Sequence, residues 1–168
     1  MRKLWMTLIM VAMGAVTVLF AQGTSSSAII KERVTYMQEH VALTGKETQT
    51  FWKVYEEFLV AEMKAMDTYR KNLEKQGIKL GTSGTNKEII DKLTDQQLTY
   101  LQDQKFELRK NLLNLETTYH KKFKAILSPH HLQDLYNKEY EFKRYLTTKK
   151  KEAKNEPSGP VNAGKKKR

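Results

Sequence analysis

The sequence predicts an all-α protein: a four-helix hairpin or bundle with one long central helix and a disordered basic C-terminal tail. Two observations lead to this fold class. Apolar side chains recur at steps of three and four residues in four segments, which is the period of helices that are buried on one side. Hydroxyl residues suited to capping precede these segments, and no segment alternates convincingly as a strand would.

The longest segment runs from Thr85 to Leu127 without Pro or Gly. Thr85 can cap its start, and Glu88 stands at the capping-box position. At ~1.5 Å per residue this helix is a rod of roughly 60 Å, and its apolar seam needs partner helices to cover it. The seam consists of Ile90, Leu93, Gln97, Leu101, Gln104, Leu108, Leu112, Leu115, Tyr119, Phe123 and Ile126.

The segment Leu93-Thr94-x-x-Gln97 inside this run allows a second interpretation, because Thr94 and Gln97 also have the spacing of a capping box. The chain would then bend at Leu93 and start a helix there. We favour one continuous helix, since the apolar seam keeps its phase across Leu93.

Two helices are expected before the long one. The first begins after Ser25–Ser27, and its apolar stripe is Ile30, Val34, Met37 and Val41. Thr44 caps the second, with Glu47 at the capping-box position. The second helix is apolar over a wide arc, which predicts packing on two neighbours; alternatively, part of its aromatic face is a binding surface. That arc contains Phe51, Trp52, Tyr55, Phe58, Leu59, Met63, Met66, Tyr69 and Leu73.

A loop from Gly77 to Gly84 leads into the long helix, and Ser128-Pro129 starts the fourth helix. Leu127 before that cap and Leu132 after it have the spacing of a hydrophobic staple. The fourth helix is expected to end near residue 148. Its apolar positions are Leu132, Leu135, Tyr136, Tyr140, Phe142 and Leu146.

The N-terminus predicts export to the periplasm. Arg2 and Lys3 precede a largely apolar stretch, Leu4–Phe20, and small residues follow, with cleavage after Ala21 or after Gly23. Residues 1–23 are therefore interpreted as a signal peptide, with an uncleaved membrane anchor as the alternative. The chain has no Cys, so neither lipid attachment at a Cys nor disulfides are expected.

The remaining chain divides into a helical domain, residues 24–148, and a Lys-rich tail, residues 149–168, predicted to be disordered. The formal charge is +11, and the tail alone has eight basic and two acidic residues. In an exported protein this charge favours contact with an anionic membrane surface or with acidic proteins. We do not expect the protein to bind nucleic acid. A solubilising tail without a specific partner is the alternative.

Catalysis and cofactors are not expected. There is no Cys nucleophile, no G-x-S-x-G, no H-E-x-x-H and no phosphate-binding loop. His130 and His131 are neighbours on a helix and point about 100° apart, so they do not share a face. We expect no metal site; zinc or copper binding through His120 with His131 is the alternative.

A pattern of apolar residue, hydroxyl cap and third-position partner occurs three times: Leu43-Thr44-x-x-Glu47, Leu93-Thr94-x-x-Gln97 and Leu127-Ser128-x-x-His131. With the signal peptide and the helical body, it resembles the Spy/CpxP-type family of small periplasmic proteins, which carry LTxxQ motifs. Only the middle copy has the full motif. Residues 43–58 and 106–146 also resemble an exported subgroup often labelled as a sensor of an ECF-type sigma factor.

The resemblance implies a curved, often dimeric helical cradle that binds unfolded proteins without ATP, in proteins that sense or damp envelope stress, sometimes with metal involvement. We therefore expect a periplasmic ATP-independent chaperone-like or envelope-stress protein that binds unfolded clients. The alternative is a regulatory partner of a membrane stress-sensing system, either a sensor kinase or an ECF sigma factor pathway. An adaptor that holds the envelope through its tail is a third reading.

The candidate client-binding residues lie on the long helix. With Leu101 as the centre of the seam, Phe106 and Leu113 fall roughly 120–140° away from it on a helix of ~3.6 residues per turn. On the same outer side are Lys110, Lys121 and Lys124. Apolar groups among cations suit transient capture of unfolded chains. Alternatively, another helix or a second copy covers Phe106 and Leu113.

The seam also bears on oligomeric state. The shorter first and fourth helices cover only part of the long rod, and Gln97 and Gln104 interrupt the seam at two successive positions. Polar residues at such positions commonly set register or partner number. We expect a homodimer in which two long helices lie antiparallel and these amides pair.

Overall fold

The computed structural model describes residues 26–79 and 89–155 and confirms the all-α class. It contains α2 (Ser26–His40), α3 (Gly45–Lys75), α5 (Asp95–Ile126) and α6 (Pro129–Asn155), and no strand lies within the described residues. None of the helices in these ranges is long and apolar enough to cross a membrane. The signal-peptide region, residues 1–25, and residues 156–168 of the tail lie outside the described parts of the chain.

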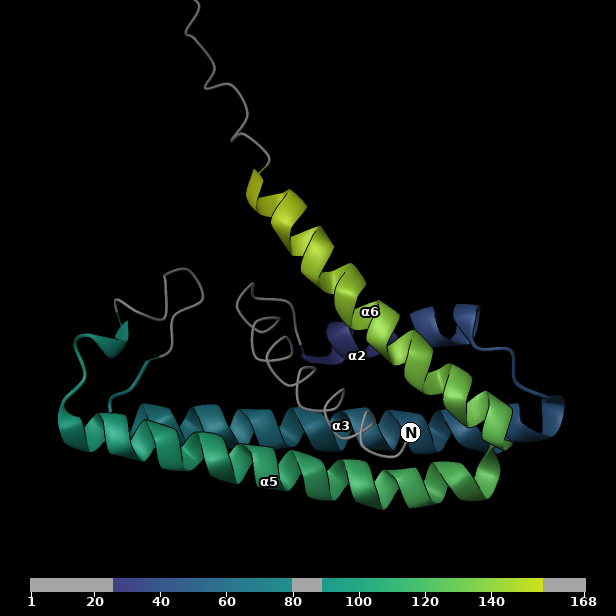
Figure 1. Cartoon of the computed structure of the whole chain (residues 1–168), viewed down its shortest axis with the longest axis horizontal. Helices are drawn as coiled ribbons and strands as arrows, with labels where there is room; N and C mark the ends of the chain where they lie inside the picture. The colour runs from purple at the N-terminus through teal and green to yellow at the C-terminus, as the bar shows by residue number, and fades with distance from the viewer. Residues whose placement is uncertain (1–25, 80–88, 156–168) are drawn as a thin grey trace, which may run out of the picture.

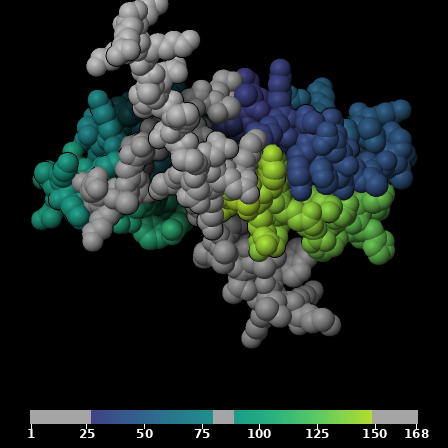
Figure 2. Space-filling model, turned by 90° about the horizontal axis from the view of Figure 1, so that it is seen from above, coloured from purple at the N-terminus to yellow at the C-terminus, as the bar shows by residue number. Residues whose placement is uncertain are grey.

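The architecture is a long antiparallel hairpin of α3 and α5, with α2 and α6 packed on one end of it (Figure 1). The helix α2 contacts both α3 and α6, while α6 follows the hairpin only at its start and then diverges from it at an angle (Figure 1). From above, the surfaces of α2 and α6 adjoin toward one end of the molecule, and the described residues near the end of α3 and the start of α5, in teal, lie at the other (Figure 2).

This arrangement divides the core into two clusters. The first is at the four-helix end, and its buried members are Met37, Val41, Phe51, Tyr55, Phe58, Leu59, Phe123, Leu127, Leu135, Phe142 and Leu146. The second lies between α3 and α5 toward the turn and contains Met66, Tyr69, Leu73, Ile78, Leu101, Leu108 and Leu112. The wide apolar arc of α3 thus packs on two neighbours, α2 and α5, as its sequence predicts.

The start of α5 differs from the expectation. The predicted continuous helix across Leu93 is wrong, because α5 begins at Asp95 and Thr94 is its N-cap. The Thr94 Oγ1 accepts a hydrogen bond from the Gln97 N–H (3.2 Å), and the Gln97 side chain accepts one from the Thr94 N–H (3.1 Å). This capping box satisfies donors that a continuous helix would bond to preceding carbonyls.

The apolar seam keeps its phase across the break for a different reason. Ile90 ends a short helical stretch and Leu93 lies in the turn that follows, and both pack against the second cluster. The Leu93 N–H donates to the Ile90 carbonyl (3.1 Å). The apolar pattern therefore continues through a turn that interrupts the helix. Thr85 and Glu88, the expected cap and its partner, lie outside the described residues.

The other helix ends follow their local sequence. At the end of α3, Gly77 has φ = 71°, the Ile78 N–H donates to the Leu73 carbonyl (3.0 Å) and the Gly77 N–H to that of Glu74 (2.9 Å). This pair of bonds is a Schellman motif, which needs a residue at positive φ. The helix α6 starts after Ser128 as expected, but it continues to Asn155, past the boundary expected at residue 148.

Candidate functional site

The five candidate client-binding residues lie on exposed positions of α5. Phe106 is 64% and Leu113 is 52% exposed, and both are among the few large apolar side chains in the described ranges with such exposure. Lys110, Lys121 and Lys124 are exposed too. None of the described helices covers Phe106 or Leu113, so the alternative in which another helix of the same chain buries them does not hold for this part of the chain. We call these five residues the α5 stripe.

The stripe combines apolar and positively charged groups. Its members follow one another at steps of three, four and eight residues, which keeps them on one side of a helix. The Arg109 guanidinium lies 5.7 Å from the centre of the Phe106 ring, at the distance of a cation–π contact. On this side of the helix, Thr117 occupies the position between Leu113 and Lys121, so no acidic side chain lies between these two members of the stripe. The Thr117 hydroxyl donates to the Leu113 carbonyl (2.8 Å).

A second feature, a buried group of charges, was missed by the sequence reasoning. The Arg33 guanidinium on α2 donates to Glu139 on α6 through Nε (3.1 Å) and Nη2 (2.6 Å), and through Nη1 to Glu62 on α3 (2.9 Å). The Tyr55 hydroxyl donates to the same Glu139 carboxylate. We call Arg33, Tyr55, Glu62 and Glu139 the polar layer.

A signal for the polar layer does exist in the sequence. Glu62 stands between Leu59 and Met66, and Glu139 stands between Leu135 and Phe142, at the spacing of the apolar stripes. Charges at such positions face the interior and therefore need a partner there. The sequence alone does not show which residue of opposite charge reaches them.

The opposite charges of the polar layer stabilise one another against the cost of burial. Burial opposes the charge of Arg33, but Glu139, Tyr55 and Glu62 outweigh it, and the pKa of Arg33 is raised well above its usual value. Burial also opposes the charge of Glu139, but Arg33 and Lys143 keep the pKa of that carboxyl below its usual value. All three helices that contribute to the layer are thereby held together by ionised groups.

One more carboxyl faces this layer from α5. Burial raises the pKa of Glu116, while nearby Lys143 and Arg33 act in the opposite direction. Glu62 and Glu139 add repulsion, so Glu116 is the one carboxyl at the layer whose ionisation the fold disfavours.

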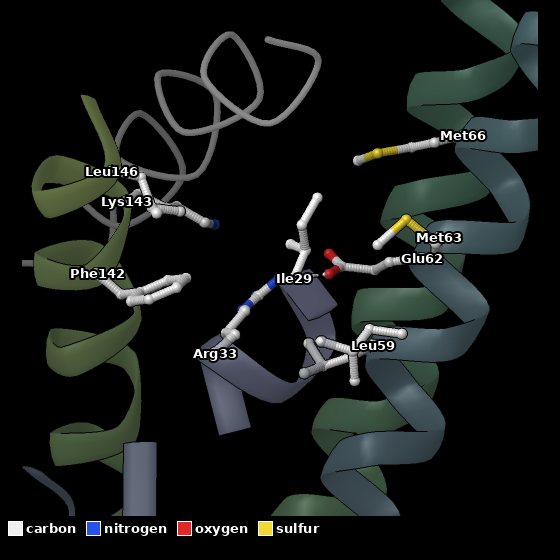
Figure 3. Close-up of a pocket in the computed structure, with 10 residues that line it drawn as sticks. Ile29, Arg33, Leu59, Glu62, Met63, Met66, Phe142, Lys143 and Leu146 are labelled. Atoms are coloured by element: carbon white, nitrogen blue, oxygen red, sulfur yellow. Dashed lines mark hydrogen bonds and ion pairs between the residues drawn. The ribbon is translucent and has the colours of Figure 1, made fainter. Parts of the chain in front are cut away.

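A small pocket adjoins the polar layer between α2, α3 and α6 (Figure 3). Its volume of about 40 Å³ admits a few water molecules, far less than sites for small-molecule substrates usually provide. Arg33 and Glu62 line it, yet both are bonded to each other, so the remaining wall is mostly apolar. The residues that line it are Ile29, Ile30, Arg33, Leu59, Glu62, Met63, Met66, Phe142, Lys143 and Leu146.

The starts of α3 and α6 share a second polar contact. The Glu47 carboxylate closes the capping box of Thr44 (2.9 Å from the Thr44 N–H) and also accepts from the Ser128 N–H (2.9 Å). It lies 2.7 Å from His131 Nδ1. The His131 hydrogen bond, followed by those of the two backbone amides, lowers the pKa of Glu47 to about 2.

The histidines considered for metal binding have other partners. His131 Nδ1 contacts Glu47, and His120 Nδ1 lies 2.7 Å from the Tyr136 hydroxyl. Within residues 26–79 and 89–155, no group of three or more His, Cys, Asp or Glu side chains has the arrangement of a metal site.

The two amides of the seam are bonded within the chain. Gln97 Nε2 donates to the Gln76 carbonyl (3.0 Å), which joins the start of α5 to the end of α3. Gln104 Oε1 accepts from Asn72 Nδ2 (3.0 Å). Each amide thus has a partner within the chain, and the expected pairing of these amides across a dimer stays a prediction.

Comparison of the chain with models of protein families, with curated proteins and with solved structures found no match.

Proposed function

We propose that the protein is an exported, ATP-independent binder of unfolded or aggregation-prone proteins, and that the α5 stripe is where clients bind. The observation that carries the proposal is the exposure of Phe106 and Leu113, at 64% and 52%, beside exposed lysines on one helix. A monomeric fold normally buries such side chains, and an exposed group of them often marks a binding surface.

The charged and the apolar residues of the stripe have separate roles in this function. The lysines attract chains with acidic segments and speed the encounter, while Phe106 and Leu113 supply the apolar contact that prolongs it. The helix is continuous over 32 residues and buries its other side, so the stripe is exposed without rearrangement of the fold.

Aggregation suppression by the mature protein tests the proposal. The double variant Phe106→Ser, Leu113→Ser should lose most of its protection of an unfolding client. Val60→Ser is the matched control, because Val60 is exposed to 51%, nearly as much as Leu113, but lies on α3. If the double variant folds with a wild-type melting temperature and protects as well as the wild type, clients bind elsewhere.

The stripe could instead bind a second copy of the chain, and sedimentation of the same proteins tests this by measuring their oligomeric state. We propose a homodimer at micromolar concentration. If the stripe is the dimer interface, the double variant becomes monomeric. If it is a client surface, the variant keeps its oligomeric state and loses protection. Regulation of a membrane stress sensor is the competing function; binding to a sensor domain without any protection of clients would favour it.

A further inference from the structure

The three methionines in the described parts of the chain differ sharply in access to solvent. Met37 is fully buried, with 0% exposure, in the first cluster. Met66 is 4% exposed and belongs to the second cluster, yet it lines the pocket beside the polar layer. Met63 also lines this pocket, is partly exposed and belongs to neither cluster.

Chemistry adds a second observation. The whole chain has no Cys, so the thioethers of methionine are its most readily oxidised side chains. In the pocket, Met63 and Met66 extend from α3 toward α6, and the Lys143 side chain points toward them from the opposite wall (Figure 3). A small oxidant that enters the pocket meets both sulfur atoms, whereas Met37 is closed off by packed side chains.

We propose that this pocket is a site of methionine oxidation, at which Met63 reacts first and Met66 second with two-electron oxidants such as hydrogen peroxide or hypochlorous acid. With hydrogen peroxide, a lone pair of the thioether sulfur attacks one peroxide oxygen and the O–O bond breaks. The oxygen remains on sulfur as a sulfoxide, and the other oxygen leaves as water after proton transfer. The sulfur loses two electrons and the peroxide gains them.

The two positions give different physical consequences. A sulfoxide at Met63 adds a polar oxygen to the pocket, whose opposite wall carries the Lys143 ammonium, and Met63 belongs to neither core cluster. A sulfoxide at Met66 places the same oxygen among the apolar side chains of the second cluster. Burial of a polar group without a partner is destabilising. The first oxidation therefore changes the chemistry of the pocket, and the second loosens the hairpin.

Peptide mapping after mild peroxide treatment of the full chain tests the site. Trypsin separates the three positions, because Met37, Met63 and Met66 fall in the peptides 34–46, 54–64 and 65–70. We expect Met63 to oxidise at least about tenfold faster than Met37, which can react only when the structure opens. Met66 should be intermediate. The same treatment in urea should make the three rates equal.

Two variants complete the test. Met63→Leu keeps the pocket apolar and similar in volume and should abolish the oxidised form of the 54–64 peptide. Met37→Leu should leave that species unchanged. The melting temperature should hold after oxidation of Met63 and fall once Met66 is oxidised. Oxidation of Met37 as fast as that of Met63 in the folded protein, or a ratio that is the same with and without urea, would overturn the proposal.

Discussion

Arg33 and Glu139 are 106 residues apart in the sequence, yet they form a two-pronged ion pair at the four-helix end of the molecule. The pair joins α2 to α6, and Glu62 extends it to α3. The side chains of Arg33 and its two carboxylate partners are only 11–12% exposed. A buried pair of this kind contributes less to stability than its attraction suggests, but loss of one partner leaves an uncompensated charge.

Arg33→Leu should therefore be strongly destabilising. We expect the free energy of unfolding at pH 7 to fall by about 3–5 kcal/mol, because Glu139 and Glu62 then lack their counter-ion. Urea unfolding followed by circular dichroism measures it. Lys138→Ala breaks the surface pair with Glu141 and should change the free energy of unfolding far less, because solvent screens exposed pairs. Equal effects of the two substitutions would show that the polar layer is not held as described.

The contact between Glu47 and His131 predicts an acid-dependent contribution to stability. The folded protein lowers the pKa of Glu47 to about 2, so the ionised carboxylate stabilises the fold. This contribution is complete above the unfolded pKa of about 4.3 and is lost as the pH falls toward 2. Glu47→Gln should cost about 1–3 kcal/mol at pH 7, the range for hydrogen bonds to a charged group.

The pH dependence distinguishes this effect from a simple loss of packing. Between pH 5 and pH 2, the difference in melting temperature between Glu47→Gln and the wild type should shrink. Glu139 also contributes acid sensitivity in this range, since its pKa is lowered, but it is present in both proteins. Glu56→Gln, at an exposed position on α3, is the control. A difference that stays constant with pH would contradict the assigned role of the carboxylate.

Glu116 predicts the opposite sign. Burial raises the pKa of this carboxyl, so its ionised form costs stability at neutral pH, and the fold gains stability as the pH falls through the raised pKa. Glu116→Gln should accordingly raise the melting temperature at pH 7 and have little effect near pH 3, where both states are protonated. Glu107→Gln, on an exposed position of the same helix, should change neither. Destabilisation by Glu116→Gln at pH 7 would show that its carboxylate is needed in ionised form.

The comparison of sequence and structure separates local signals from non-local ones. The capping box of Thr44 and Glu47 and the start of α6 after Ser128 were predicted correctly, because each depends on residues within one turn. The start of α5 was misplaced at Thr85 although Thr94 and Gln97 carry the same signature. Ile90 and Leu93 pack on the core with the same apolar spacing that a continuous helix would show. Periodicity therefore could not distinguish a continuous helix from one that is interrupted at Leu93.

The candidate site divides in the same way. The position of Phe106 and Leu113 away from the seam follows from helical geometry, and both are exposed within the chain. The polar layer depends on which of many charges meet when α2 and α6 close on the hairpin. Arg33 lies 29 positions before Glu62 and 106 positions before Glu139 in the sequence, and no local pattern links them.

Leu101 tests the packing between α3 and α5 most directly. It is 1% exposed in the second cluster, whose described members lie on these two helices and in the segments that adjoin them. Leu101→Ala should cost about 2–5 kcal/mol through lost burial and the cavity left behind. Leu101→Asp should cost more, because it buries a charge without a partner.

Leu113→Ala is the matched control, because Leu113 is the same residue type on the same helix but is 52% exposed. This substitution should change stability by about 0.5 kcal/mol or less. Urea unfolding of the three variants decides it, and a Leu101→Asp protein as stable as the wild type would show that the buried side of α5 is assigned wrongly.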